Sequence, residues 1–221
     1  IAAMSTAQVA VVSSTQLAAL STTDFAAFNT AQIGAISASA MVGLTLSQLA
    51  ALTTTQEAAI STSAIAGLST ASIVGLSTGQ AAALSTTQLG ALTSTQLGAM
   101  ETADLATLSS TQVGAFSTKA IAGLTTAQLG SLTTAQAAGL TSGQICALSS
   151  TQIAALSTAV VAGLSTTQVA SISAKAVAGL TTAQLGALTT TQEAALSSTQ
   201  VAGLTTTQIA AFTTDKAAAL T

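Results

Sequence analysis

The side chains that could do chemistry are few in this chain of 221 residues, and their types exclude most kinds of active site. His, Trp, Tyr and Pro are missing, Arg does not occur, and three Lys stand against six acids. The single cysteine, Cys146, would need an activating base to act as a nucleophile, and no His is available. Without a nucleophile, a base and an orienting group, we expect no catalytic residues and no enzyme.

Two glutamates stand out because they replace an apolar residue within the same octet, L-T-T-T-Q-E-A-A. They are Glu57 and Glu193, which lie 136 residues apart. A functional interpretation would pair them as ion ligands. Their separation of 17 octets places them far apart in any regular repeat, so we interpret both as charges tolerated at an edge position near a helix start.

The other charged side chains occupy positions where structural roles suffice. Asp24, Glu101 and Asp104 fall where a first helical turn is expected, and negative charge is favourable there. The remaining four are expected to face solvent: Lys119, Lys175, Asp215 and Lys216. Cys146 stands among Ala and Gly, where we expect a small buried thiol. No Asp-rich loop, Cys/His cluster or Gly-rich phosphate loop occurs, so we expect no metal site and no cofactor.

These residues are positioned by one internal period that explains the whole chain. A large apolar residue recurs every eight residues, from Met4 and Val12 to Phe212 and Leu220, with no insertion or deletion. Counting that residue as position one, the consensus is L-[ST]-[ST]-x-Q-[LIV]-[AG]-[AG]. Residues 1–221 are therefore one continuous array of about 27 octads. Because the sequence starts and stops inside an octad, we expect it to be an excerpt of a longer chain.

Each octad contains a helix-start signal. Position two is Ser or Thr in all but two complete octads, which carry Asn29 and Glu101, and Gln follows three residues later in 18 of 27. This spacing is the capping box, in which the hydroxyl accepts from the N3 amide and Gln accepts from the cap amide. The apolar residues at positions one and six can form the accompanying hydrophobic staple.

Two other architectures compete with a chain of short helices. One long helix would rotate its apolar face by about 80° per octad, so no apolar stripe would persist. A β-solenoid is the serious rival, but positions one and six have opposite parity and would point to opposite faces of a strand. Ala and Gln are also poor strand formers.

We therefore predict an all-α solenoid of very short capped helices, one per octad, with a β-solenoid as the alternative. Helices this short are unstable alone, so the octads must stack into coils that bury positions one and six. The small residues at positions seven and eight should allow close packing. Octads that end in Ala-Gly, such as Ile65-Ala66-Gly67, suggest a left-handed exit from the helix at the glycine.

Charge and hydropathy limit the partners of such an array. The net charge of −3 and the scarcity of basic residues exclude a surface that neutralises phosphates, so we expect no nucleic-acid binding. Ser, Thr and Gln interrupt the apolar residues too often for a membrane span of about 18 residues or more. We expect no transmembrane segment.

The octads resemble the L-T-T-x-Q-[IV]-x-[AS] repeat tracts of very large secreted bacterial proteins of the surface or adhesin-like kind, and the resemblance covers the whole chain. It implies an extracellular or cell-surface stalk, matrix or filament protein. The Gly/Asp-rich nonapeptides that bind calcium in that class are missing here, so the resemblance implies no calcium site.

Together these features predict a structural repeat protein that assembles with itself, laterally or end to end. Uniform octads imply a uniform operation that relates each coil to the next. The alternative is a module that binds ice or polysaccharide through ordered ranks of Thr, Ser and Gln. Against the alternative, Ser and Thr are already used as caps, and they interchange freely where a lattice-matching face should prefer Thr.

Overall fold

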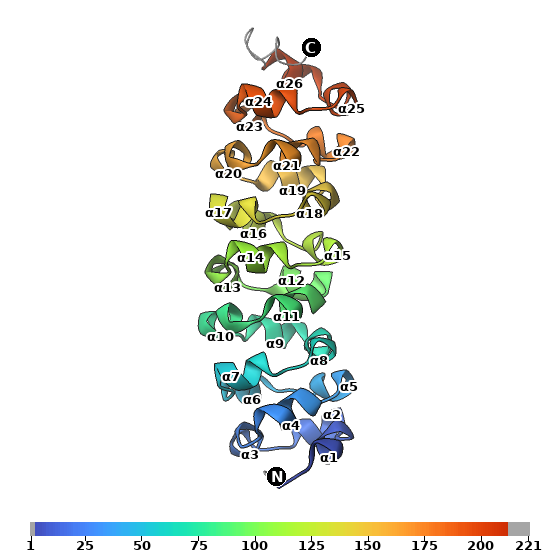
Figure 1. Cartoon of the computed structure of the whole chain (residues 1–221), viewed down its shortest axis with the longest axis vertical. Helices are drawn as coiled ribbons and strands as arrows, with labels where there is room; N and C mark the ends of the chain where they lie inside the picture. Colours follow the sequence, from blue (N-terminus) through green and yellow to red (C-terminus); the bar gives the residue numbers. More distant parts are fainter. Residues whose placement is uncertain (1–2, 212–221) are drawn as a thin grey trace. The chain divides into compact units, whose positions relative to one another are not determined.

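The computed structural model describes residues 3–211 and places them in two compact units (Figure 1). Unit 1 comprises residues 1–108 and 115–117, and unit 2 comprises residues 109–114 and 118–221. Each unit is a stack of short helices joined by tight corners.

The helices follow the octads one by one. Those of unit 1 are α1 (Thr6–Ala10), α2 (Ser14–Ala18), α3 (Thr22–Ala26), α4 (Thr30–Ala35), α5 (Ala38–Met41), α6 (Leu46–Ala50), α7 (Thr54–Ala58), α8 (Thr62–Gly67), α9 (Thr70–Val74), α10 (Thr78–Ala83), α11 (Thr86–Ala91), α12 (Ser94–Ala99) and α13 (Thr102–Thr107). Those of unit 2 are α14 (Ser110–Gly114), α15 (Thr118–Ile121), α16 (Thr126–Ser131), α17 (Thr134–Ala138), α18 (Ser142–Ala147), α19 (Ser150–Ala155), α20 (Thr158–Gly163), α21 (Thr166–Ala170), α22 (Ala174–Val177), α23 (Thr182–Ala187), α24 (Thr190–Ala194), α25 (Ser198–Ala202) and α26 (Thr206–Ala210).

No β-strand occurs between residues 3 and 211, and no helix there exceeds six residues. The predicted all-α solenoid is confirmed, and the β-solenoid alternative is wrong. None of the helices in this part of the chain is long and apolar enough to cross a membrane.

Capping chemistry determines where each helix begins. At α12, Thr93 has an extended backbone (φ −78°, ψ 164°), the Gln96 amide donates to its Oγ1 (3.2 Å), and the Thr93 amide donates to Gln96 Oε1 (2.9 Å). All 18 glutamines at position five form this capping box in the described residues. The next position-one residue returns to extended backbone, as at Met100 (φ −60°, ψ 136°), and so ends the helix.

The core of each unit consists of positions one and six, as the sequence predicts. In α12 the position-six residue Leu97 is 0 % exposed and the preceding position-one residue Leu92 is 2 % exposed. Position four faces solvent, and the exposure predicted for Lys119 and Lys175 is confirmed. Asp215 and Lys216 lie outside the described residues.

A coil takes between three and four octads. Within each unit, a helix packs on the helix three octads later, for example α5 on α8 in unit 1 and α14 on α17 in unit 2 (Figure 1). Contacts between coils also reach further along the chain. Side-chain amides of glutamine meet carbonyl groups 28 to 31 residues earlier, in the helix four octads back and in the corner after it. Because these separations fall between 24 and 32 residues, equivalent positions of successive coils do not stack in straight ranks.

The glycines at position eight serve close approach, and the predicted left-handed exit is wrong. Between residues 3 and 211 no glycine has a positive φ. A Cβ added at Gly43 or Gly67 would instead collide with the backbone of the residue 29 earlier, Ser14 or Ala38. Glycine is required here because two helix backbones touch at this point.

Candidate functional site at the interface between coils

The glutamine at position five joins one coil to the next. In α6, Gln48 Oε1 accepts from the Thr45 amide of its own octad, while Nε2 donates to the carbonyl oxygens of Leu17 (2.8 Å) and Leu20 (2.9 Å) in the preceding coil. One side chain therefore caps its own helix and also satisfies carbonyl groups at the end of another, which have no partner within that helix.

The same arrangement recurs in both units. Gln96 donates to Ile65 O and Leu68 O at 2.8 Å each in unit 1, and Gln200 of unit 2 donates to Val169 O (3.0 Å) and Ile172 O (2.7 Å). Gln96 is 3 % exposed and Gln200 is 2 % exposed. The bonds are therefore shielded from water. Ile65 O and Val169 O also accept from the amides of Leu68 and Ile172, so removing the glutamine donor would leave Leu68 O or Ile172 O unsatisfied, at about 1–3 kcal/mol.

The sequence predicted only the capping half of this arrangement. A capping box accepts Glu as well as Gln at N3, because only an acceptor oxygen is needed. Position five nevertheless carries Gln in 18 octads and Glu in none. That exclusion of Glu was the available signal for the second role, since a carboxylate cannot donate a hydrogen bond to a carbonyl group.

Six described octads lack Gln or Asp at position five, and all six end in Gly. Their position-five residues are Ala40, Ala64, Ser72, Ala120, Val160 and Ala176, and their final glycines are Gly43, Gly67, Gly75, Gly123, Gly163 and Gly179. At Gly43, Gly67 and Gly179 an added Cβ would fall on backbone atoms of the preceding coil. Direct contact between backbones therefore takes the place of the glutamine bridge in these three octads, whereas Gly163 lies against the side chain of Thr134.

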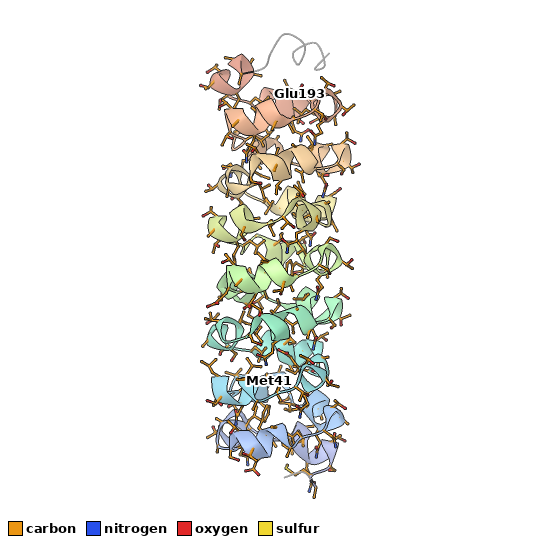
Figure 2. All side chains as sticks on the ribbon, turned by 90° about the vertical axis from the view of Figure 1, so that its left-hand side faces the viewer. Met41 and Glu193 are labelled. Atoms are coloured by element: carbon orange, nitrogen blue, oxygen red, sulfur yellow. The ribbon has the colours of Figure 1, made fainter. Side chains whose placement is uncertain are left out.

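The two glutamates that the sequence singled out lie in the core, so their interpretation as edge residues was wrong. Glu57 is 1 % exposed and Glu193 is 0 % exposed, as buried as Met41 at the same position six (Figure 2). Both oxygens of Glu57 are buried without a hydrogen-bond partner, and burial raises the pKa of Glu57 to about 7. Glu57 belongs to unit 1 and Glu193 belongs to unit 2.

Cys146 is exposed, which contradicts the predicted burial. Position seven points away from the core, and the small residues there hide this in the sequence because Ala and Gly fit either environment. Cys146 borders a surface recess of about 430 Å³ that Lys175 also lines. In the described chain no three acids or cysteines lie close enough together to hold a metal ion between them.

The acids of the first turns differ from one another. Asp24 is exposed, and its carboxylate accepts a hydrogen bond from Ser21 Oγ (2.7 Å). Glu101 occupies a cap position without making the cap hydrogen bond. Asp104 is buried at 1 % exposure, and its Oδ2 has no partner.

An apolar recess of about 310 Å³ opens at the first described coil of unit 1. Its walls include Val11, which is 80 % exposed, together with Gln8 and Gln16. Both glutamines close their own capping boxes, but their Nε2 atoms have no acceptor within the described residues. This is the surface that a preceding coil would cover, whether it came from the same chain or from another copy.

The fold and its interface define a helical solenoid built from octapeptide repeats. The sequence pattern of the ALTTAQ repeat matches residues 20–54, 74–102, 97–134, 126–158 and 161–198. These segments cover more than half of the chain, which therefore belongs to the ALTTAQ repeat family. No curated protein matches it.

Proposed function

We propose that this chain is a structural element of an extracellular or cell-surface filament, stalk or matrix, that it has no enzymatic activity, and that it assembles with copies of itself. The observation that carries the proposal is the repeated interface. The same bridge between a glutamine and the carbonyl groups of the preceding coil recurs in unit 1 and unit 2, at Gln96 and at Gln200.

A repeated interface suits a structural role because it can be extended without redesign. In a solenoid each coil contacts only its neighbours, so stability is approximately the sum of coil terms and interface terms. Repeating the same octad along the chain therefore lengthens the solenoid without interrupting it. A binding module or an enzyme instead concentrates unusual residues at one place, whereas the buried polar side chains here are mostly the glutamines used in capping and bridging.

The recess at Met4 and Val11 supports addition of a further coil. It is mainly apolar, and it presents the Nε2 donors of Gln8 and Gln16. Elsewhere in both units, glutamine Nε2 atoms at the same octad position donate to carbonyl groups of the preceding coil. Gln8 and Gln16 therefore offer donors of the kind that such carbonyl groups accept from. A second copy presenting such carbonyl groups would complete the same interface.

An exterior location is supported by the resemblance to secreted bacterial repeat tracts and by the composition. Only three Lys and no Arg are present, so proteases with trypsin-like specificity find few cleavage sites. The short exposed corners carry mainly Ser and Thr.

The competing proposal, a face that binds ice or polysaccharide, finds less support. Such a face needs its hydroxyl groups in straight, regularly spaced ranks. The coil takes between three and four octads, so Ser and Thr of equivalent positions are offset from one coil to the next. Position two is also occupied by the capping bonds that start each helix.

The test combines assembly with location. Sedimentation velocity and negative-stain electron microscopy of the purified chain should show oligomers or filaments that grow with concentration. The double variant Gln8→Glu, Gln16→Glu keeps both capping acceptors and removes both free donors, so it should assemble less. Immunogold labelling of intact producing cells should find the protein outside. A chain that stays monomeric at all concentrations, or that is found only inside the cell, would contradict the proposal. Thermal hysteresis in solution would favour the ice-binding alternative.

A further inference from the structure

One octad carries acids at both of the positions that other octads use for cap and bridge. It spans residues 100–107, with Glu101 at the cap and Asp104 at position five. The Glu101 side chain makes no cap hydrogen bond, so its carboxylate is available. Asp104 is 1 % exposed and its Oδ2 has no hydrogen-bond partner. Unit 1 contains no Lys or Arg that could neutralise either group.

Asp104 occupies the octad position from which glutamines reach carbonyl oxygens of the preceding coil. At position five, the side chains of Gln48 and Gln96 reach the carbonyl groups 31 and 28 residues earlier. For Asp104 these carbonyl groups belong to Ile73 and Leu76. The Ile73 oxygen accepts from the Leu76 amide (3.3 Å), whereas no described residue donates to the Leu76 oxygen.

This corner of unit 1 therefore gathers oxygen acceptors without a donor. Burial raises the pKa of Asp104, and the negative charge of Glu101 raises it further. The second cause shows that the two carboxylates are close enough to repel each other. In the bridged octads a Gln amide supplies the positive end of a dipole here, whereas Asp104 brings a buried carboxyl group to the same place.

We propose that Asp104, Glu101 and the carbonyl oxygen of Leu76 bind a hard divalent cation of the Ca²⁺ type. The ligands are all oxygen atoms, which such cations prefer, and water completes the coordination shell on the side of exposed Glu101. Mg²⁺ fits less well because it demands a near-ideal octahedron and loses its water reluctantly. Three protein oxygens make a weak site, with a dissociation constant on the order of 0.1–1 mM, typical of extracellular modules.

The bound cation would perform the task of the missing glutamine amide. It would tie α13 to the corner between α9 and α10, all within unit 1, by bridging carboxylate and carbonyl oxygens. This site does not depend on the filament proposal, because it needs only the fold of one chain. We therefore expect a divalent cation to stabilise the contact between these two coils locally.

The experiment uses the whole chain and two readouts, calorimetric titration with CaCl₂ and thermal unfolding followed by circular dichroism at 222 nm. In 10 mM CaCl₂, compared with NaCl of equal ionic strength, the melting temperature should rise by roughly 3–10 °C. The matched variant Asp104→Gln restores the consensus bridge. It should give no binding heat and no calcium response, and without calcium it should melt at least as high as the loaded wild-type chain.

Three results would overturn the proposal. The first is a wild-type chain that shows neither binding heat nor a shift in melting temperature up to 10 mM CaCl₂. The second is an equal response in Asp104→Gln, which would place the ion elsewhere. The third is stabilisation by acid with no effect of calcium, which would show that Asp104 takes a proton in place of a cation. Glu101→Thr, which restores the cap, should weaken binding at least threefold, and unchanged affinity would remove Glu101 from the site.

Discussion

The carboxyl group of Glu57 should make the stability of unit 1 depend on pH. Glu57 is 1 % exposed, and both of its oxygens lack a hydrogen-bond partner. The helices that pack on α7 are α4 and α10, and neither carries a charged side chain. The other acids of the unit are Asp24, Glu101 and Asp104, and the unit has no basic residue. Folding therefore favours the neutral acid.

The magnitude follows from the pKa of Glu57, which burial raises from 4.5 to about 7. Because the folded state binds the proton more tightly than the unfolded state, the stabilising contribution is complete below pH 4.5. It declines as the pH rises and is lost above about pH 7. A difference of this size corresponds to about 3 kcal/mol between pH 4 and pH 8. That is a large share of the free energy of unfolding of an ordinary domain.

The assay is urea unfolding of the wild-type chain and of Glu57→Leu, followed at 222 nm from pH 4 to pH 8.5. The variant restores the consensus apolar residue and removes only this titration. The difference in unfolding free energy between the two chains should widen by about 3 kcal/mol as the pH rises, and amides of α7 should lose hydrogen-exchange protection first. A difference that is constant over this range would show that the Glu57 carboxyl is solvated in the folded chain, and the reasoning would fail.

Three further experiments, two of them with a matched control substitution, test the interface and the core. Gln96→Glu keeps the capping acceptor but turns a carboxylate toward two buried carbonyl groups, so urea unfolding should show a loss of about 3 kcal/mol at pH 7 that is smaller at pH 4. Gly67→Ala drives a Cβ into backbone and should lower the unfolding free energy by about 1–3 kcal/mol, whereas Gly79→Ala, with open space around it, should be neutral or slightly stabilising. Leu132 is 5 % exposed, so Leu132→Asp should lower the free energy of unfolding by several kcal/mol. Lys119 is exposed, so Lys119→Asp should change the melting temperature little. Equal effects of the two substitutions would refute the assignment of core and surface.

The helices and the core could be predicted because their signals are local. A capping box lies within four residues. Helix geometry alone places position six and the next position one on the same side of a helix. The number of octads in a coil could not be predicted in the same way. It depends on the angle at each corner and on which distant carbonyl groups the glutamines reach, and neither is encoded within one octad.

The errors at single residues have a common physical cause. The edge position predicted for Glu57 and Glu193 follows from the tolerance of negative charge near a helix start, whereas their place at position six of the octad puts both side chains in the core. For Cys146, the neighbouring Ala and Gly residues favour the prediction of burial. Residues at positions seven and eight are small because helix backbones approach closely there, and the Cys146 side chain is nevertheless exposed to solvent. In both cases the position within the octad was a better guide than the residue type.

The glutamine bridge also explains why so uniform a sequence folds into one register. A slip of one octad preserves every capping box, since each box is local. It would still change which residues of distant coils meet, because some octads lack the bridging amide and others lack the glycine. In the described residues the six octads with neither Gln nor Asp at position five end in Gly, and a slip would move a larger position-eight residue onto the backbone or a carbonyl group away from its donor. The irregular scatter of these octads along the chain therefore carries the long-range information that the repeat itself lacks, and a fully regular array would lose it.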